Sequence, residues 1–175
     1  MKVTFVKKGD RRYAVEVHRD RYPDLWCGSI GYDDYLPHDL LHFVAEAEFS
    51  LDGGVFGDLA AGGNARIFIP ADKKLVAKMW RANRRRRTRL TDGRRSEELA
   101  AALERAWTMH RRGEKVGNPE CERLLPLLDE LAERWHGLQV GGSMTLPWPR
   151  PERRRAKPAA RRRHKRERRG GMSRR

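Results

Sequence analysis

Charge is distributed very unevenly along this chain, and this limits which part of it can fold. The last 28 residues contain fourteen Lys or Arg side chains and two acidic ones, while the preceding 147 residues carry only +3 of the formal net charge of +15. A segment so rich in like charge and so poor in apolar side chains cannot offset the entropy of ordering its backbone. We therefore predict a single folded domain over residues 1–140 and a disordered polybasic tail over residues 141–175.

The N-terminal part of the body has the alternating pattern of a β-hairpin. Apolar residues alternate over residues 3–7 and again over residues 13–17, and Gly9-Asp10 lies between the two runs. A third, shorter strand is expected near Leu25–Ser29. Together these segments predict a small antiparallel sheet at the start of the chain.

A helix from Pro37 to Phe49 is predicted to follow these strands. Proline suits the first helical position because its missing N–H would have no partner there in any case. A further helical segment is expected over residues 55–61 and a short strand over residues 66–69. Four apolar side chains share one face of the first helix at the helical spacing, and we expect that face to pack on the hairpin: Leu40, Phe43, Val44 and Ala47.

The second half of the body is predicted to be helical. Residues 71–90 form an increasingly basic helix, and a second helix begins near Ser96 with a periodic apolar stripe. Asn118-Pro119 is a strong start signal for another helix, although Pro126 either kinks that helix or marks its true beginning. We expect the last two helices to form an antiparallel helical hairpin, so the predicted fold class is α+β.

The strongest local signal for chemistry is the run His38-Asp39-Leu40-Leu41-His42. Two histidines four residues apart lie on one helix face, one turn above the other, and can share a metal ion. Glu46 lies a further turn along, and Asp58 is a carboxylate from outside the helix that could complete the ligand set. His38 lies in the first helical turn, where the helix dipole favours the neutral imidazole that a metal needs. Zinc is the cofactor expected of such a set.

The same residues also fit a simpler interpretation. His38, His42 and Glu46 point away from the apolar face of their helix, so they could form its solvated side. Pairs of histidines at this spacing arise by chance, and the sequence shows no further partners that would orient them as ligands. A metal site and a solvated or hydrogen-bonded pair therefore both stay open.

The spacing of His38 and His42 resembles two known metal motifs. One is the zincin pattern His-Glu-x-x-His, in which the glutamate is the general base; Asp39 stands at that position and is the candidate catalytic residue. The other is the His-Asp-x-x-His motif of the ubiquinone-biosynthesis scaffold proteins, where a later glutamate completes a zinc site. Gly54 lies near that later position here, and Asp58 could play its part after an insertion. The stretch from Gly31 to Gly63 is also similar to small uncharacterised bacterial proteins.

The basic residues are the second signal, and it is electrostatic. Clustered arginines neutralise several phosphates at once, and the released counterions make binding to nucleic acid favourable and salt-dependent. Arg-rich disordered segments often become ordered on RNA, and Trp80 offers a stacking surface near the basic run of the body. The expected contacts are Arg84, Arg85, Arg86 and Arg87 in the body and Arg153, Arg154, Arg155, Arg161, Arg162, Arg163, Lys165 and Arg166 in the tail.

Other partners also fit a polybasic tail. It can keep a protein soluble, bind an acidic protein or attach to an anionic membrane, although no amphipathic helix or lipidation motif accompanies it. No apolar run approaches the ~18 residues that span a bilayer, and charges interrupt the N-terminal residues too early for a signal peptide. We therefore expect a cytoplasmic protein without a transmembrane segment.

The cysteines carry little chemical signal. Cys27 and Cys121 are too few for a disulfide framework. Cys121, with His110 and His136 nearby in the predicted helical hairpin, could form a nucleophile or metal cluster. Packing of Cys121 in the core is favoured, because a free cysteine behaves as a small hydrophobic residue.

Three functional hypotheses follow from these patterns. The leading one is binding of nucleic acid, RNA above all, without sequence preference, because no pattern here matches a recognition helix, an RRM or a zinc finger. The second is a zinc-dependent hydrolase or a metal-supported scaffold centred on His38 and His42. The third is an adaptor whose helical hairpin docks another protein.

Overall fold

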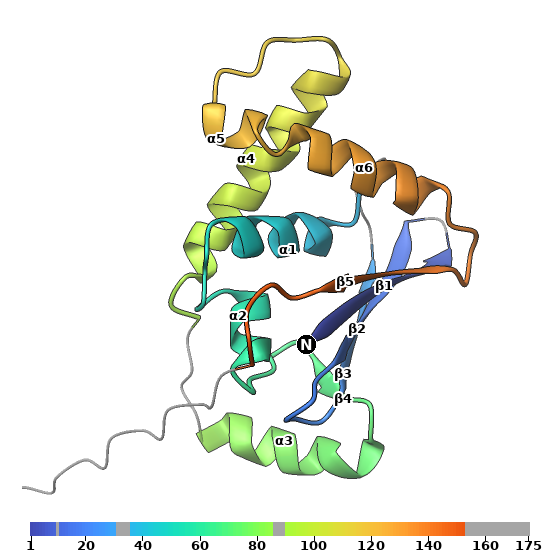
Figure 1. Ribbon diagram of the computed structural model, residues 1–175. Helices are drawn as coiled ribbons and strands as arrows, with labels where there is room; N and C mark the ends of the chain where they lie inside the picture. Colours follow the sequence, from blue (N-terminus) through green and yellow to red (C-terminus); the bar gives the residue numbers. More distant parts are fainter. Residues whose placement is uncertain (10, 31–35, 86–89, 153–175) are drawn as a thin grey trace, which may run out of the picture.

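The chain folds as an antiparallel sheet with helices packed on it (Figure 1). The computed structural model describes residues 1–9, 11–30, 36–85 and 90–152. The predicted α+β class is confirmed. In chain order the elements are β1 (Lys2–Gly9), β2 (Arg12–His18), β3 (Leu25–Ile30), α1 (His38–Glu48), α2 (Val55–Ala60), β4 (Ile69–Pro70), α3 (Lys73–Arg85), α4 (Gly93–Arg111), α5 (Pro119–Glu122), α6 (Leu125–His136) and β5 (Ser143–Pro147).

The sheet has five strands in the order β4-β3-β2-β1-β5, and all neighbours are antiparallel. The predicted hairpin is β1 with β2, in a register that pairs Phe5 with Val15. Val15 in turn pairs with Cys27 of the predicted third strand. The expected strand over residues 66–69 is shifted, because only Ile69–Pro70 pairs with β3. Val3, Phe5, Tyr13, Val15 and Val17 alternate along β1 and β2 and are buried on one face of the sheet, while Val6 and Ala14 between them are buried as well.

Helix α1 packs on that apolar face, as its sequence predicts. Phe43 meets Phe5 of β1 edge-on, with ring centroids 6.2 Å apart, and its ring also lies 5.3 Å from that of Phe56 in α2. The opposite side of α1 is also covered, because α4 packs against it. His42 and Glu46 are therefore buried, with 4% and 0% of their surface exposed, so the interpretation as solvated is wrong for these two residues, whereas the side chain of His38 is 45% exposed.

The strand β5 corrects the predicted boundary of the folded part. Residues from 141 onward were expected to be disordered, yet Ser143–Pro147 pairs with β1 along its whole length. Trp148 then packs in the core, where its ring lies 5.4 Å from that of Phe43. The alternation of Met144 and Leu146 is too short to stand out beside the flanking glycines and prolines. The rest of the predicted tail, residues 153–175, lies outside the described residues.

The last helices form the predicted hairpin around a shared tryptophan. Trp107 of α4 is fully buried and donates through Nε1 to Asp129 of α6, at 2.7 Å. The Asn118 side chain accepts from the backbone N–H groups of Glu120 and Cys121, which confirms the start signal for α5. A separate helix, α6, begins next to Pro126. None of the helices in the described ranges is long and apolar enough to cross a membrane.

A buried arginine joins the loop after β2 to the end of α2. Arg19 is 5% exposed, and its guanidinium donates to the carbonyl of Pro23 within its own loop. It also donates to the carbonyls of Leu59 and Gly63, at 3.1 and 2.8 Å. These carbonyls lie at the C-terminal end of α2, where the helix dipole favours a cation.

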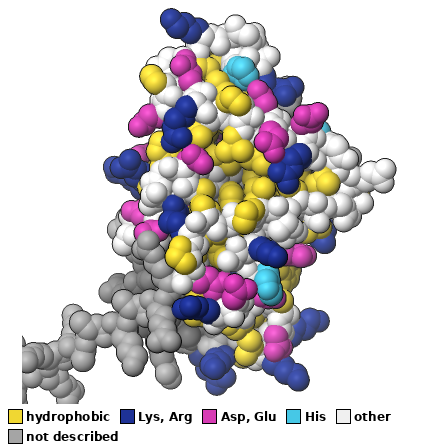
Figure 2. Space-filling view, in the orientation of Figure 1, with side chains coloured by type: hydrophobic (Ala, Val, Ile, Leu, Met, Phe, Trp, Pro, Cys, Tyr) yellow, Lys and Arg dark blue, Asp and Glu magenta, His cyan; other side chains and the backbone are white. Residues whose placement is uncertain are grey.

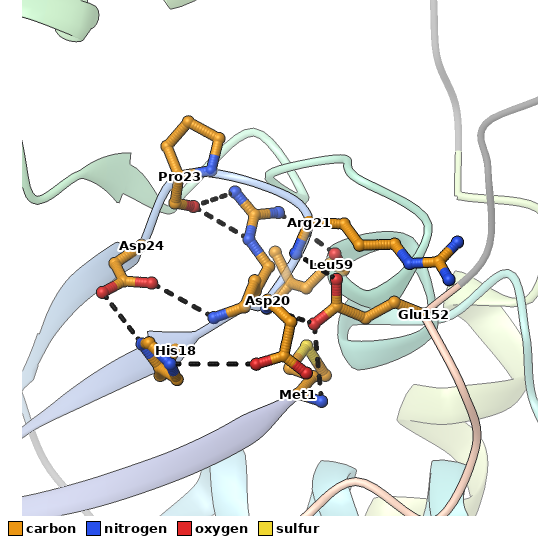
Figure 3. Close-up of polar contacts among 9 residues, drawn as sticks. Met1, His18, Asp20, Arg21, Pro23, Asp24, Leu59 and Glu152 are labelled. Atoms are coloured by element: carbon orange, nitrogen blue, oxygen red, sulfur yellow. Dashed lines mark hydrogen bonds and ion pairs between the residues drawn. The ribbon is translucent and has the colours of Figure 1, made fainter.

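Glu152 fixes the end of the described chain to the same loop. Figure 3 shows its carboxylate among the backbone groups of this loop, where it accepts from the N–H of Asp20 at 2.8 Å and that of Arg21 at 3.0 Å. The amino group of Met1 lies 3.5 Å away. Burial opposes ionisation of Glu152, but the two N–H groups and the amino group outweigh it, so the pKa of Glu152 lies below its ordinary value.

Replacement of Trp148 tests whether the chain beyond residue 140 belongs to the core. We expect Trp148→Ala to lower the free energy of unfolding by about 3–5 kcal/mol, because it removes a large buried ring. Trp26→Ala is the matched control, since Trp26 is 41% exposed and should change stability by less than about 1 kcal/mol. Urea unfolding followed by circular dichroism measures both, and equal effects would contradict the expectation.

The depressed pKa of Glu152 makes its contribution to stability depend on pH. A carboxyl group whose pKa is lower in the folded state stabilises that state above its unfolded pKa, and the benefit is lost as the pH falls through its folded pKa. We expect Glu152→Gln to cost about 1–2 kcal/mol at neutral pH. The difference from wild type should shrink below about pH 4.5. Unfolding measured from pH 7 to pH 3 checks this, with Glu16→Gln at an exposed position as the charge control.

Candidate metal centre

Helices α1 and α4 bring two histidines and one glutamate together. His38 and His42 lie one turn apart on α1, and Glu97 lies in the first part of α4. The two Nε2 atoms are 3.1 Å apart. Oε2 of Glu97 lies 3.4 Å from Nε2 of His42 and 3.7 Å from Nε2 of His38. Within the described part of the chain, this is the one group of three or more such side chains whose ligand atoms lie close enough to hold one metal ion.

His42 is the buried member of the group, and its ring is oriented by a hydrogen bond to a buried serine. Its Nδ1 lies 2.7 Å from Oγ of Ser96, a fully buried residue of α4. The Ser96 hydroxyl donates to Oε1 of Glu46 at 2.8 Å, so its oxygen accepts from Nδ1–H of His42. This arrangement leaves the lone pair of Nε2 directed toward His38 and Glu97. Burial lowers the pKa of His42, His38 acts in the same direction, and the carboxylates of Glu97 and Asp39 oppose it.

Glu46 was predicted as a ligand, but the structure gives it another role. Its carboxylate accepts from three backbone N–H groups at the start of α2, those of Val55, Phe56 and Gly57, at 2.7–3.2 Å. Gly54 allows this approach, because a Cβ there would overlap the carboxylate carbon. Burial raises the pKa of Glu46, while the Ser96 hydroxyl and the N–H groups favour its ionised form.

Asp58 and Asp39 also lie outside the metal group. Asp58, predicted as a ligand, accepts from the backbone N–H of Ala65 at 2.9 Å, and Gly63 leaves room for its side chain. Asp39 stands at the position of the zincin base, and its Oδ2 accepts from the Tyr13 hydroxyl at 2.9 Å. Both carboxylates thus make contacts that hold the fold together, Asp58 between α2 and the loop after it and Asp39 between α1 and β2.

The other predicted residues are placed as follows. Cys121 is buried in the core as favoured by its sequence, with 1% of its surface exposed, and burial raises the pKa of its thiol. Nε2 of His110 lies 3.0 Å from Oδ2 of Asp129 in α6. Arg84 and Arg85 lie in the last turn of α3, but their side chains lie outside the described part of the chain, as do Arg86, Arg87 and all the predicted contacts of the tail.

Sequence reasoning found two members of the metal group and missed the third. Glu97 directly follows the predicted helix start at Ser96, a position that favours acids through the dipole alone. Ser96 was noted only as part of the same helix start. Ser96 and Glu97 are adjacent in the chain, and both lie more than 50 positions after His42. Their role depends on how α4 crosses α1, which no local pattern specifies.

Removal of the Ser96 hydroxyl tests its hydrogen bonds with His42 and Glu46. We expect Ser96→Ala to lower the free energy of unfolding by about 1–3 kcal/mol, because a buried carboxylate oxygen and a buried N–H each lose a partner. The matched control is Ser143→Ala at an exposed position of β5, which should change stability by less than about 0.5 kcal/mol. Urea unfolding at neutral pH measures both. A loss no larger in Ser96→Ala than in the control would show that this contact is unimportant.

No protein-family model, curated protein or solved structure matches this chain. The resemblances of the Gly31–Gly63 stretch and of the His38–His42 spacing therefore remain expectations from sequence.

Proposed function

We propose that the protein binds one divalent transition metal ion, zinc by preference, through His38, His42 and Glu97. The observation that carries this proposal is the set of three distances between the ligand atoms, 3.1, 3.4 and 3.7 Å. Ligand atoms at about 2.0–2.2 Å from a tetrahedral ion lie about 3.3–3.6 Å apart. The three atoms are thus spaced as one face of such a tetrahedron.

The chemistry of the donors supports zinc. Two imidazole nitrogens and one carboxylate oxygen are ligands that zinc accepts readily. Nδ1 of His42 is engaged by Ser96, so its Nε2 is available with a fixed orientation. Hydrogen bonds of this kind commonly orient metal-binding histidines and raise their affinity.

The placement of the site favours a metal that supports the fold. His38 and His42 belong to α1 and Glu97 to α4, so a shared ion would link two helices that are distant in sequence. Such a link stabilises the folded chain because the ligands are assembled only there. This role corresponds to the metal-supported scaffold of the second hypothesis from the sequence.

Hydrolytic chemistry is the alternative use of the same ligands. The side chains of His38 and Glu97 are 45% and 68% exposed, so a fourth ligand could enter from solvent. A zinc ion with three protein ligands and an open position activates a water molecule. Asp39, the candidate base, is held by Tyr13, and this contact favours the supporting role over catalysis.

Zinc binding is tested directly on the untagged protein. We expect zinc at about a hundredfold above its Kd to raise the Tm by about 5 °C or more, because it binds only the folded chain. His38→Ala and Glu97→Gln should each weaken zinc binding by about tenfold or more. Glu98→Gln is the matched control on the same helix, since Glu98 pairs with Arg94 instead. Calorimetry and elemental analysis give the affinity and the stoichiometry.

Two outcomes would contradict this proposal. The wild type could fail to bind zinc, cobalt or manganese in the calorimeter and carry no metal after purification. Alternatively, His38→Ala and Glu97→Gln could bind zinc as tightly as Glu98→Gln. In either case the two histidines would be a hydrogen-bonded pair.

Binding of nucleic acid without sequence preference is the second proposed function. Residues 153–175 carry a net charge of +12, and the Arg84–Arg87 run adds a second basic cluster. Binding through such clusters is driven by counterion release. A surface in the described part of the chain also supports this function.

A further inference from the structure

Helix α3 concentrates the positive charge of the folded body. Residues 1–152 carry a net charge of +3, whereas residues 73–85, which form α3, alone carry +6 and contain no acid. The other residues of 1–152 are therefore net negative, at −3. Segregation of this kind, with basic residues gathered on one helix, is the electrostatic mark of a surface that binds a polyanion.

Four basic side chains of α3 face solvent. Lys73, Lys74, Lys78 and Arg81 are all exposed. At the helical spacing they cover one broad side of α3, and the less exposed Leu75, Val76 and Met79 lie on the other. Figure 2 shows Lys and Arg side chains at the end of the molecule formed by α3.

A large aromatic ring lies at the edge of this basic side. Trp80 is 49% exposed. At 100° per residue it lies almost in line with Lys73, and Lys73 marks one edge of the basic side of α3. An exposed tryptophan next to clustered cations provides what a nucleotide base and its phosphate require, a stacking plane and a positive charge.

We propose that the solvent-facing side of α3 binds single-stranded nucleic acid, with Lys73, Lys74, Lys78 and Arg81 on the phosphates and Trp80 stacked on a base. This inference rests on the second proposed function and assigns it a surface separate from the tail. A single strand fits better than a duplex, because only unpaired bases expose a face to Trp80.

Full-length protein tests this with a fluorescein-labelled oligouridylate and with the same strand annealed to oligoadenylate. We expect Trp80→Ala to weaken binding of the single strand by about fivefold or more, while the slope of log K against log salt stays unchanged. Binding of the duplex should not change. Fluorescence anisotropy measured over a series of salt concentrations gives both quantities.

The contribution of the lysines is tested by the salt dependence of binding. Lys74→Gln/Lys78→Gln removes two phosphate contacts, so the slope of log K against log salt should fall by about 1.4 for the single strand. Arg105→Gln/Lys115→Gln is the matched control. These two residues are exposed in α4 and in the loop after it, and that loop lies at the other end of the molecule from α3 (Figure 1).

Trp26 is the control for Trp80. It is 41% exposed in an open groove of about 390 Å³ whose walls include Glu16 and Asp24, so its surroundings repel phosphate. If Trp80→Ala and Trp26→Ala bind the oligouridylate equally well and the lysine variant keeps the wild-type slope, the inference about α3 is overturned and binding belongs to the tail. If the wild-type protein does not bind the single strand at low salt, the second proposed function fails as well. Equal loss on strand and duplex would also refute stacking by Trp80.

Discussion

The buried carboxylate of Glu46 is the interaction on which the centre of this fold depends. It lies on α1, accepts from three backbone N–H groups that begin α2 and receives the hydroxyl of Ser96 from α4. One side chain thus fixes three helices, and burial of a charge is tolerable because each oxygen has hydrogen-bond donors. His42 is placed by the same serine, so the geometry of the candidate metal centre derives from this contact.

Helix α2 illustrates how charge and backbone act together here. Its N-terminal N–H groups meet the carboxylate of Glu46, and its C-terminal carbonyl of Leu59 meets the guanidinium of Arg19. A helix of this length has little stability of its own. Opposite charges at its two ends match its dipole and satisfy groups that would otherwise be buried without partners. Short glycine-rich segments such as this one therefore depend on long-range polar contacts.

Much of the fold could be predicted because its signals are local. The alternation in β1 and β2, the proline before α1 and the cap at Asn118 each depend on neighbouring residues. His38 and His42 were found for the same reason. Glu97 and Ser96 were missed because their role depends on the packing of α4 against α1, and Glu46 was misassigned because its partners lie on another helix. The strand β5 was missed because a five-residue segment gains its order from β1.

The position of β1 between β2 and β5 has a consequence for folding during synthesis. Thr4 and Thr145 face each other across the sheet although 141 positions separate them in the chain. Until the ribosome has made β5, β1 exposes an unpaired edge and the apolar core lacks Met144 and Trp148. Such an edge can pair with other chains, and contacts of this separation form slowly. The nascent chain therefore remains open to aggregation until β5 has been made, and a chaperone that covers β1 would act during this interval.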